Sequence, residues 1–212
     1  MLFERAERTI ELYSRIQHFL EELDAKGSFA SPDVLVSVNG FANSLEDEDH
    51  RASLFGGAGL CLCRAGHYEL AERVTSMARG PERAHEFRLL AEELARAQQL
   101  QQSLHVYALV RETVLTENYS TGIVQELEVS AKGLATLGKR DLAIKFWGDA
   151  ITLARPKQSS GGHEGPESSG TLLAAVEALC GLGEIERARE IAAAIQLEIL
   201  KERALRFIEK QA

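Results

Sequence analysis

Cysteine, proline and tryptophan are scarce in this chain of 212 residues. The three cysteines, Cys61, Cys63 and Cys180, form an odd set without the spacing of a disulfide framework, which favours a reducing compartment. Cys61 and Cys63 diverge by about 200° on a helix, so they cannot easily share a metal ion. With Cys180 far along the chain, we expect no zinc site and interpret the cysteines as structural residues.

Positive charge and long apolar runs are also lacking. The formal net charge is −8, which argues against broad binding to nucleic acid or to an anionic membrane surface. No stretch approaches the 18 uninterrupted apolar residues that a membrane-spanning helix needs. Residues 1–10 have no apolar core of a signal peptide, so we expect a cytoplasmic protein.

The motifs of common enzymes are absent as well. The chain has neither a metal-binding HExxH pair nor the GxSxG turn of hydrolases. The glycine-rich segment 56–59 lacks the Lys-Ser/Thr of a phosphate loop, and we interpret it as a place of close helix packing. The acidic run 46–49 lacks the turn glycine of a calcium loop and suits a solvated helix start. We therefore expect no catalytic residue, no metal and no cofactor.

A spaced motif of leucine, glycine and alanine is the strongest positive signal. The glycine has a leucine four residues before it and an alanine five residues after it. This pattern predicts a helix, a turn at a glycine with positive φ, and a second helix whose alanine allows close backbone approach. The three copies are Leu62-Gly66-Ala71, Leu134-Gly138-Ala143 and Leu179-Gly183-Ala188.

A fourth, degenerate copy places Gln98 at the turn. Leu94 then lies four residues before it, and Ser103 replaces the alanine five residues after it. Mostly small residues stand seven positions before the four turns, and apolar residues stand twelve positions after them. The first set is Gly59, Ala91, Ala131 and Val176, and the second is Ala78, Val110, Ala150 and Ile195.

The remaining apolar pattern is helical throughout. Even the strand-like segment 34–38 follows Ser31-Pro32-Asp33, a typical helix start, and we assign it to a helix. Residues 156–170 are rich in glycine and serine, so we expect a flexible loop there. The predicted helices are 3–24, 32–45, 50–65, 68–79, 81–97, 100–116, 120–137, 140–155, 168–182, 185–196 and 199–211.

The segment from Ser130 to Pro156 resembles a tetratricopeptide repeat. It combines the repeated small residue, leucine, glycine and alanine with the aromatic Trp147 and a terminating proline, and we interpret Trp147 as a core residue. The resemblance covers residues 50–212 and implies an all-α solenoid, in which antiparallel hairpins stack into a right-handed superhelix. Residues 1–49 do not match, and we expect them to form an N-terminal helical cap. The last helix, 199–211, would cover the open end of the stack.

In such arrays the first helix of each hairpin lines a concave face, and this face usually binds a peptide or a helix. The alignment places side chains of both charge signs on it, and Cys63 as a partly exposed thiol. The two-lysine, two-asparagine set that clamps a terminal carboxylate in some tetratricopeptide domains is absent. The predicted partner-binding residues are Arg88, Glu92, Arg96, Gln125, Glu128, Lys132 and Glu177.

The sequence thus favours a non-enzymatic interaction module, a scaffold or adaptor whose groove binds a peptide or amphipathic helix of a larger partner. Three alternatives stay open. The chain could be a regulatory, sensor or chaperone subunit whose loop 156–170 orders on binding, it could associate with itself, or, least favoured, it could be an enzyme. Recognition of RNA by the repeats is disfavoured because the predicted groove is not basic.

Overall fold

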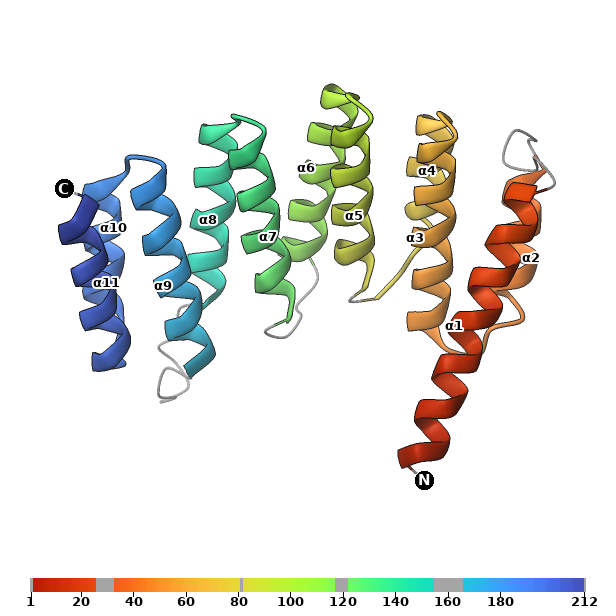
Figure 1. Ribbon diagram of the computed structural model, residues 1–212, viewed down its shortest axis with the longest axis horizontal. Coiled ribbons are helices and arrows are strands. Elements are labelled where there is room, and N and C mark those ends of the chain that lie inside the picture. Colours follow the sequence, from red (N-terminus) through yellow and green to blue (C-terminus); the bar gives the residue numbers. More distant parts are fainter. Residues whose placement is uncertain (1, 26–32, 81, 117–121, 155–165, 212) are drawn as a thin grey trace. The chain divides into compact units, whose positions relative to one another are not determined.

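The described residues of the chain form helices and no strands. The computed structural model describes residues 2–25, 33–80, 82–116, 122–154 and 166–211 (Figure 1). The helices are α1 (Leu2–Ala25), α2 (Val34–Ala42), α3 (Glu48–Arg64), α4 (Tyr68–Thr75), α5 (Glu82–Arg96), α6 (Leu100–Thr116), α7 (Gly122–Thr136), α8 (Arg140–Ala154), α9 (Pro166–Gly181), α10 (Ile185–Ala194) and α11 (Glu198–Gln211).

Every helix predicted from the sequence has a counterpart here, and the all-α prediction is confirmed. Most ends agree within two residues. The largest difference is at α4, which ends at Thr75 and not at residue 79. There the amides of Met77 and Ala78 donate to carbonyls three residues back, so the chain leaves the α-helical pattern before Pro81.

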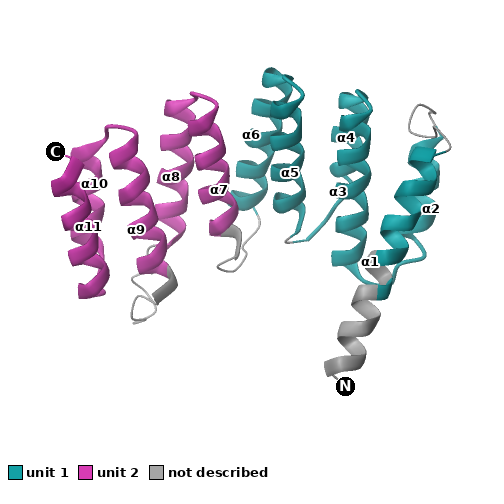
Figure 2. Cartoon of the chain, in the orientation of Figure 1, with its two compact units in different colours: residues 1–117 teal, residues 118–212 magenta. Residues whose placement is uncertain are grey.

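Two compact units divide the chain, residues 1–117 and residues 118–212 (Figure 2). In the first unit, α3 pairs with α4 and α5 pairs with α6, while α3 also packs on α5, α1 and α2. In the second unit, α7 pairs with α8 and α9 pairs with α10, while α9 also packs on α7, α8 and α11. The predicted boundary at residue 49 between a cap and a repeat array stays a prediction.

The hairpin turns close in the same way at all four predicted positions. Gly66, Gly138 and Gly183 have φ of 85°, 70° and 78°, and Gln98 has φ of 61°. At each turn the next residue donates its amide to the carbonyl of the repeated leucine, as from His67 to Leu62 at 2.9 Å. This is the Schellman arrangement, which satisfies two of the carbonyls left free at a helix end. The leucine four residues before each turn therefore takes part in this hydrogen bond through its carbonyl and in packing through its side chain.

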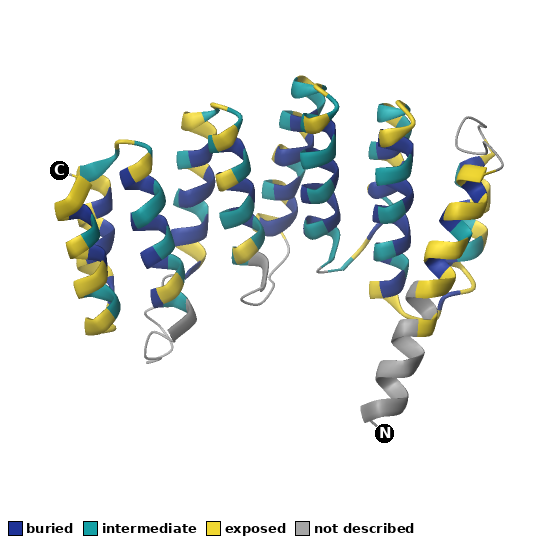
Figure 3. Ribbon diagram, viewed as in Figure 1, coloured by how far each residue is buried: buried dark blue, intermediate teal, exposed yellow. Residues whose placement is uncertain are grey.

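The side chains aligned by the repeat pattern are buried (Figure 3). Close backbone approach explains the small ones. A Cβ added at Gly59 would lie 2.1 Å from Thr75 Oγ1 and 3.2 Å from the carbonyl oxygen of Ala71 on α4. In the degenerate copy, the hydroxyl of Ser103 donates to the carbonyl oxygen of Ala91 at 2.8 Å. A serine is tolerated there because its buried hydroxyl has an acceptor.

The N-terminal helices join the first unit through an apolar seam. Val34, Val38 and Ala42 are buried on one face of α2, which explains why this strand-like segment is a helix. Phe41 stacks on Phe19 of α1 with ring centroids 4.4 Å apart. The acidic run is the start of α3, as predicted, because the carboxylate of Asp47 accepts the amides of Asp49 and His50 at 2.8 and 3.3 Å.

The predicted loop 156–170 needs a correction at its end. Helix α9 begins at Pro166, so residues 166–170 are helical and not part of a loop. Ser169 is fully buried, which gives this first part of α9 a packing role. Residues 156–165 lie outside the described residues.

Candidate partner-binding surfaces

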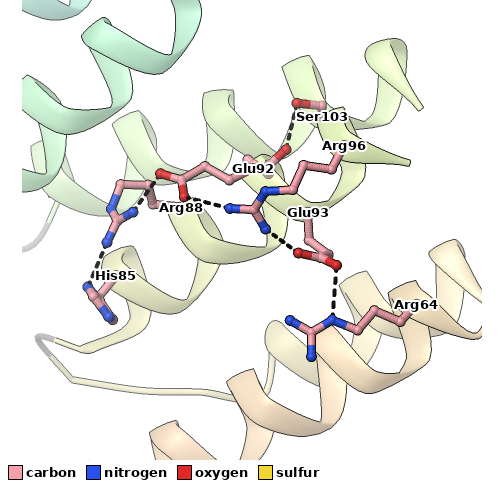
Figure 4. Close-up of polar contacts among 8 residues, drawn as sticks. Arg64, His85, Arg88, Glu92, Glu93, Arg96 and Ser103 are labelled. Atoms are coloured by element: carbon pink, nitrogen blue, oxygen red, sulfur yellow. Dashed lines mark hydrogen bonds and ion pairs between the residues drawn. The ribbon is translucent and has the colours of Figure 1, made fainter. Parts of the chain in front are cut away.

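A ladder of charged side chains runs along α5 in the first unit (Figure 4). Arg88 Nη1 donates to Glu92 Oε1 at 2.6 Å, and Arg96 Nη2 lies 3.6 Å from Glu92 Oε2. Arg96 also pairs with Glu93. At one end of the ladder Arg88 Nη2 lies 3.2 Å from His85 Nδ1. The side chains are spaced three or four residues apart, as neighbours on a helix surface must be.

The ladder continues across to α3 through Arg64. Its Nε donates to Glu93 Oε1 at 2.9 Å. This hydrogen bond lowers the pKa of Glu93 and raises the pKa of Arg64. The side chain of Glu93 is only 14% exposed, so the pair joins two hairpins at a site that is largely shielded from water on the Glu93 side. We therefore assign the Arg64–Glu93 pair a structural role.

Arg88 was predicted to be exposed on a binding face, and this is wrong. The residue is 9% exposed, and its guanidinium is held by Glu92 and His85. Burial raises the pKa of the nearby Tyr107 hydroxyl to about 12, and the charge of Glu92 adds to this effect. Since a buried charge must keep its partners, Arg88 positions the ladder and cannot leave it for a ligand without cost. Glu92 is partly buried, and Arg96 is exposed at the end of the ladder.

Cys63 is buried, as the interpretation of the cysteines as structural residues predicted, and its alternative placement as a partly exposed thiol on the concave face is wrong. The residue is 1% exposed, and burial raises the pKa of its thiol to about 11. Helix α3 packs on α1, α2, α4 and α5, and this packing leaves the Cys63 side chain almost no exposed surface. A buried thiol with a raised pKa is unreactive.

The second unit contains the other four predicted residues. Gln125 and Lys132 are exposed on α7, and Glu128 is partly exposed on the same helix. Lys132 Nζ lies 5.9 Å from the ring centroid of Trp147 on α8, at cation–π distance. Trp147 is 1% exposed, which confirms its assignment to the core. Lys132 therefore covers the indole, and only part of its side chain is available to a partner.

Glu177 lies at a groove between α9 and α11. The groove has a volume of about 680 Å³ and combines apolar and charged side chains. Glu177 accepts a hydrogen bond from Arg203 Nη2 of α11 at 3.0 Å. The remaining lining residues are all on α11: Ile199, Leu200, Glu202, Arg206, Phe207 and Lys210.

The role of α11 was foreseen only in part. It packs on α9 and α10 and buries Ala204 and Ile208, as expected of a helix that covers the end of a stack. The helix also leaves two large apolar side chains uncovered, since Leu205 is 42% exposed and Ile199 is 84% exposed. The sequence does contain a signal for the groove, because Ile199 is an apolar residue outside the buried face of α11. The pattern of this helix alone cannot show, however, that α9 leaves Ile199 uncovered.

Two kinds of site are absent from the described part of the chain. Within it, no three side chains of His, Cys, Asp or Glu come together as a metal site would require. Nor is any described helix both long and apolar enough to cross a membrane.

Comparisons with known proteins give structural likeness without sequence relatives. No protein-family model matches the chain, and no curated protein matches it. A crystal structure of a putative kinesin light chain from Podosopora anserina with nearly identical TPR-like repeats has a TM-score of 0.48 at 14% identity, over 89% of this chain and 93% of that one. A crystal structure of a variant of that protein has a TM-score of 0.49 at 14% identity, over 94% and 97% of the two chains. The tetratricopeptide-like hairpin array predicted from the sequence is confirmed in the four hairpins and their turns.

Proposed function

We propose that this protein is a non-enzymatic interaction module that binds a segment of another protein on its second unit. The observation that carries the proposal is the groove between α9 and α11, which leaves apolar side chains exposed beside ion pairs. Exposed apolar patches rimmed by polar residues are typical of protein–protein interaction sites. The predicted residue Glu177 lies in this groove.

The packing of the second unit supports a surface larger than the groove itself. Helix α9 packs on α7 and also on α11, so it connects the groove to α7. Gln125 and Lys132 are exposed on α7, and we include them in the proposed surface. We place Arg96 outside this surface, because it belongs to the ladder of the first unit.

Affinity capture with matched variants tests the proposal. The whole chain and its Arg206→Glu variant are used as baits, and the bound proteins are compared by mass spectrometry. The control is Arg189→Glu on α10. Arg189 and Arg206 are both half or more exposed, and each pairs with a glutamate of its own helix, at 2.6 and 2.7 Å. A true partner binds the wild type and the control and is lost from Arg206→Glu.

The partner must then bind as a purified protein. We expect titration calorimetry to give a saturable complex with the wild type and binding at least about tenfold weaker with Arg206→Glu. If no captured protein depends on the groove, or if purified candidates do not bind, the proposal is wrong.

A further inference from the structure

We propose that the groove between α9 and α11 binds an acidic amphipathic helix of the partner protein. This inference rests on the proposed function and adds the chemistry of the bound segment. Its apolar side chains would lie on Ile199, Leu200 and Phe207. Its carboxylates would contact Arg203, Arg206 and Lys210.

The groove has the form of a strip along one helix. The lining residues of α11 recur every three or four positions from Ile199 to Lys210 and so lie on one continuous face. This strip is about 16 Å long at 1.5 Å per residue, which is about three helical turns. An occupant helix of similar length would run along it.

The apolar part of the strip explains why a partner would bind there at all. Ile199 is 84% exposed, while Leu200 and Phe207 are partly exposed beside it. Covering such side chains removes apolar surface from water, which favours binding. The isoleucine is a candidate anchor because it has the most surface to lose.

The charges of the strip favour an acidic occupant. Three cationic side chains, Arg203, Arg206 and Lys210, stand against two acidic ones, Glu177 and Glu202. This local excess of positive charge contrasts with the net charge of −8 for the chain. An acidic segment would be attracted to the strip and repelled by much of the remaining surface, which gives both register and specificity.

The ion pairs of the strip can exchange partners. Arg206 pairs with Glu202 at 2.7 Å, but the two side chains are 72% and 56% exposed. Arg203 pairs with Glu177 at 3.0 Å and is itself 65% exposed. Exposed pairs of this kind contribute little to stability, so a carboxylate of the occupant can replace Glu202 at little cost. The buried arginine of the α5 ladder, by contrast, has no such freedom.

A set of synthetic helices tests the inference on the whole chain by fluorescence anisotropy. Each peptide has about 15 residues, apolar side chains at helical spacing and glutamate at the other positions. Members differ in the apolar residue, which is leucine, isoleucine, phenylalanine or tryptophan. A matched set replaces every glutamate with lysine. We expect acidic members to bind at least about tenfold more tightly than their lysine counterparts.

Variants of the chain locate the binding. Ile199→Ser and Arg206→Glu should each weaken the best acidic peptide at least about tenfold, whereas Arg189→Glu should leave its affinity unchanged. Both groove residues are exposed, so the variants should keep the unfolding midpoint of the wild type, and circular dichroism checks this. If no acidic peptide binds, if lysine peptides bind equally well, or if the groove variants bind like the wild type, the inference is wrong.

Other occupants would give other results. If sedimentation shows a dimer that Ile199→Ser separates, a second copy of the chain is the occupant and the inference is overturned. If phosphatidylserine vesicles bind and the acidic peptides do not, the strip contacts a membrane and the inference is overturned. If the peptides fail but a purified partner depends on Arg206, the proposed function stands and only the acidic chemistry is wrong.

Discussion

At the scale of single residues, the four turns show how the need for a positive φ affects which residue stands at the turn. Three turns use glycine and one uses Gln98, yet all four have positive φ and the same hydrogen bonds. An L-residue other than glycine is strained in this conformation, by about 1–3 kcal/mol. The strain at Gln98 is offset by the packing of its hairpin, in which Leu94 and Ser103 are buried.

Replacing this glutamine should therefore stabilise the protein. We expect Gln98→Gly to raise the free energy of unfolding by about 1 kcal/mol, measured by urea denaturation, because relief of strain outweighs the greater freedom of glycine in the unfolded chain. The matched reverse variant is Gly138→Gln, where an added Cβ meets nothing within 4 Å. It should lower the free energy of unfolding by about the same amount. A loss of stability in Gln98→Gly would contradict this reading of the turn.

At Gly59 it is the lack of space beside the buried Thr75 side chain, and not the backbone angle, that requires glycine. We expect Gly59→Ala to lower the free energy of unfolding by about 1–3 kcal/mol, because the new methyl group would overlap the buried Thr75 side chain. The control is Gly170→Ala in α9, where an added Cβ meets nothing within 4 Å. Alanine is the better helix former, so this change should raise the free energy of unfolding by about 0.5–1 kcal/mol. Equal effects at the two sites would exclude steric overlap as the cause.

At the scale of elements, hairpins are joined by polar contacts as well as by apolar packing. Arg64 and Glu93 connect α3 to α5 in the first unit. In the second unit, Arg140 of α8 donates to the carbonyl oxygen of Leu182, at the turn between α9 and α10, at 2.8 Å. Each arginine begins or ends its own helix and reaches a neighbouring hairpin. These contacts fix the register of one hairpin against the next.

The contact between α3 and α5 predicts a dependence of stability on pH. The pKa of Glu93 lies below its ordinary value of 4.5, so its stabilising effect is present above that pH and is lost as the pH falls through the lowered pKa. At pH 7 we expect Glu93→Gln to lower the free energy of unfolding by about 1 kcal/mol. Urea denaturation at a series of pH values should show this difference shrink as the pH falls below 4.5 and through the lowered pKa of Glu93.

The matched control for this experiment is Glu186→Gln. Glu186 also pairs with an arginine, but its side chain is 83% exposed. We expect a change within about 0.5 kcal/mol at every pH. A difference between wild type and Glu93→Gln that persists unchanged at low pH would show that lost packing, not lost charge, is responsible.

At the scale of the whole molecule, the chain consists of two units that each have their own buried side chains. In repeat proteins, stability is a sum over units and nearest-neighbour contacts, so a local change need not be felt everywhere. The single tryptophan is a convenient probe, since Trp147 is buried in the second unit. Its fluorescence reports on that unit, whereas circular dichroism reports on all helices.

We therefore expect the two probes to separate when one unit is weakened. Gly59→Ala should shift the transition seen by circular dichroism to lower urea concentration and leave the tryptophan transition nearly unchanged. Leu134→Ala changes a fully buried position of the second unit. It should lower the free energy of unfolding measured by tryptophan fluorescence by about 2–5 kcal/mol. Coincident transitions in both variants would mean that the chain unfolds as one cooperative unit.

The sequence by itself determined the helices, the turns and most of the core. The positions of the turns follow from local hydrogen bonding, and the apolar spacing of each helix follows from its period, so both can be read from neighbouring residues. It also placed Glu177 on a helix that takes part in a groove.

Only the tertiary structure decided which side chains are covered. Arg88 and Cys63 have helix positions compatible with exposure, and they are buried because neighbouring elements pack over them. Ile199, by contrast, is exposed, because no described side chain of α9 covers it. The exposure of a side chain depends on where a neighbouring element lies, whereas the pattern of a helix describes only that helix.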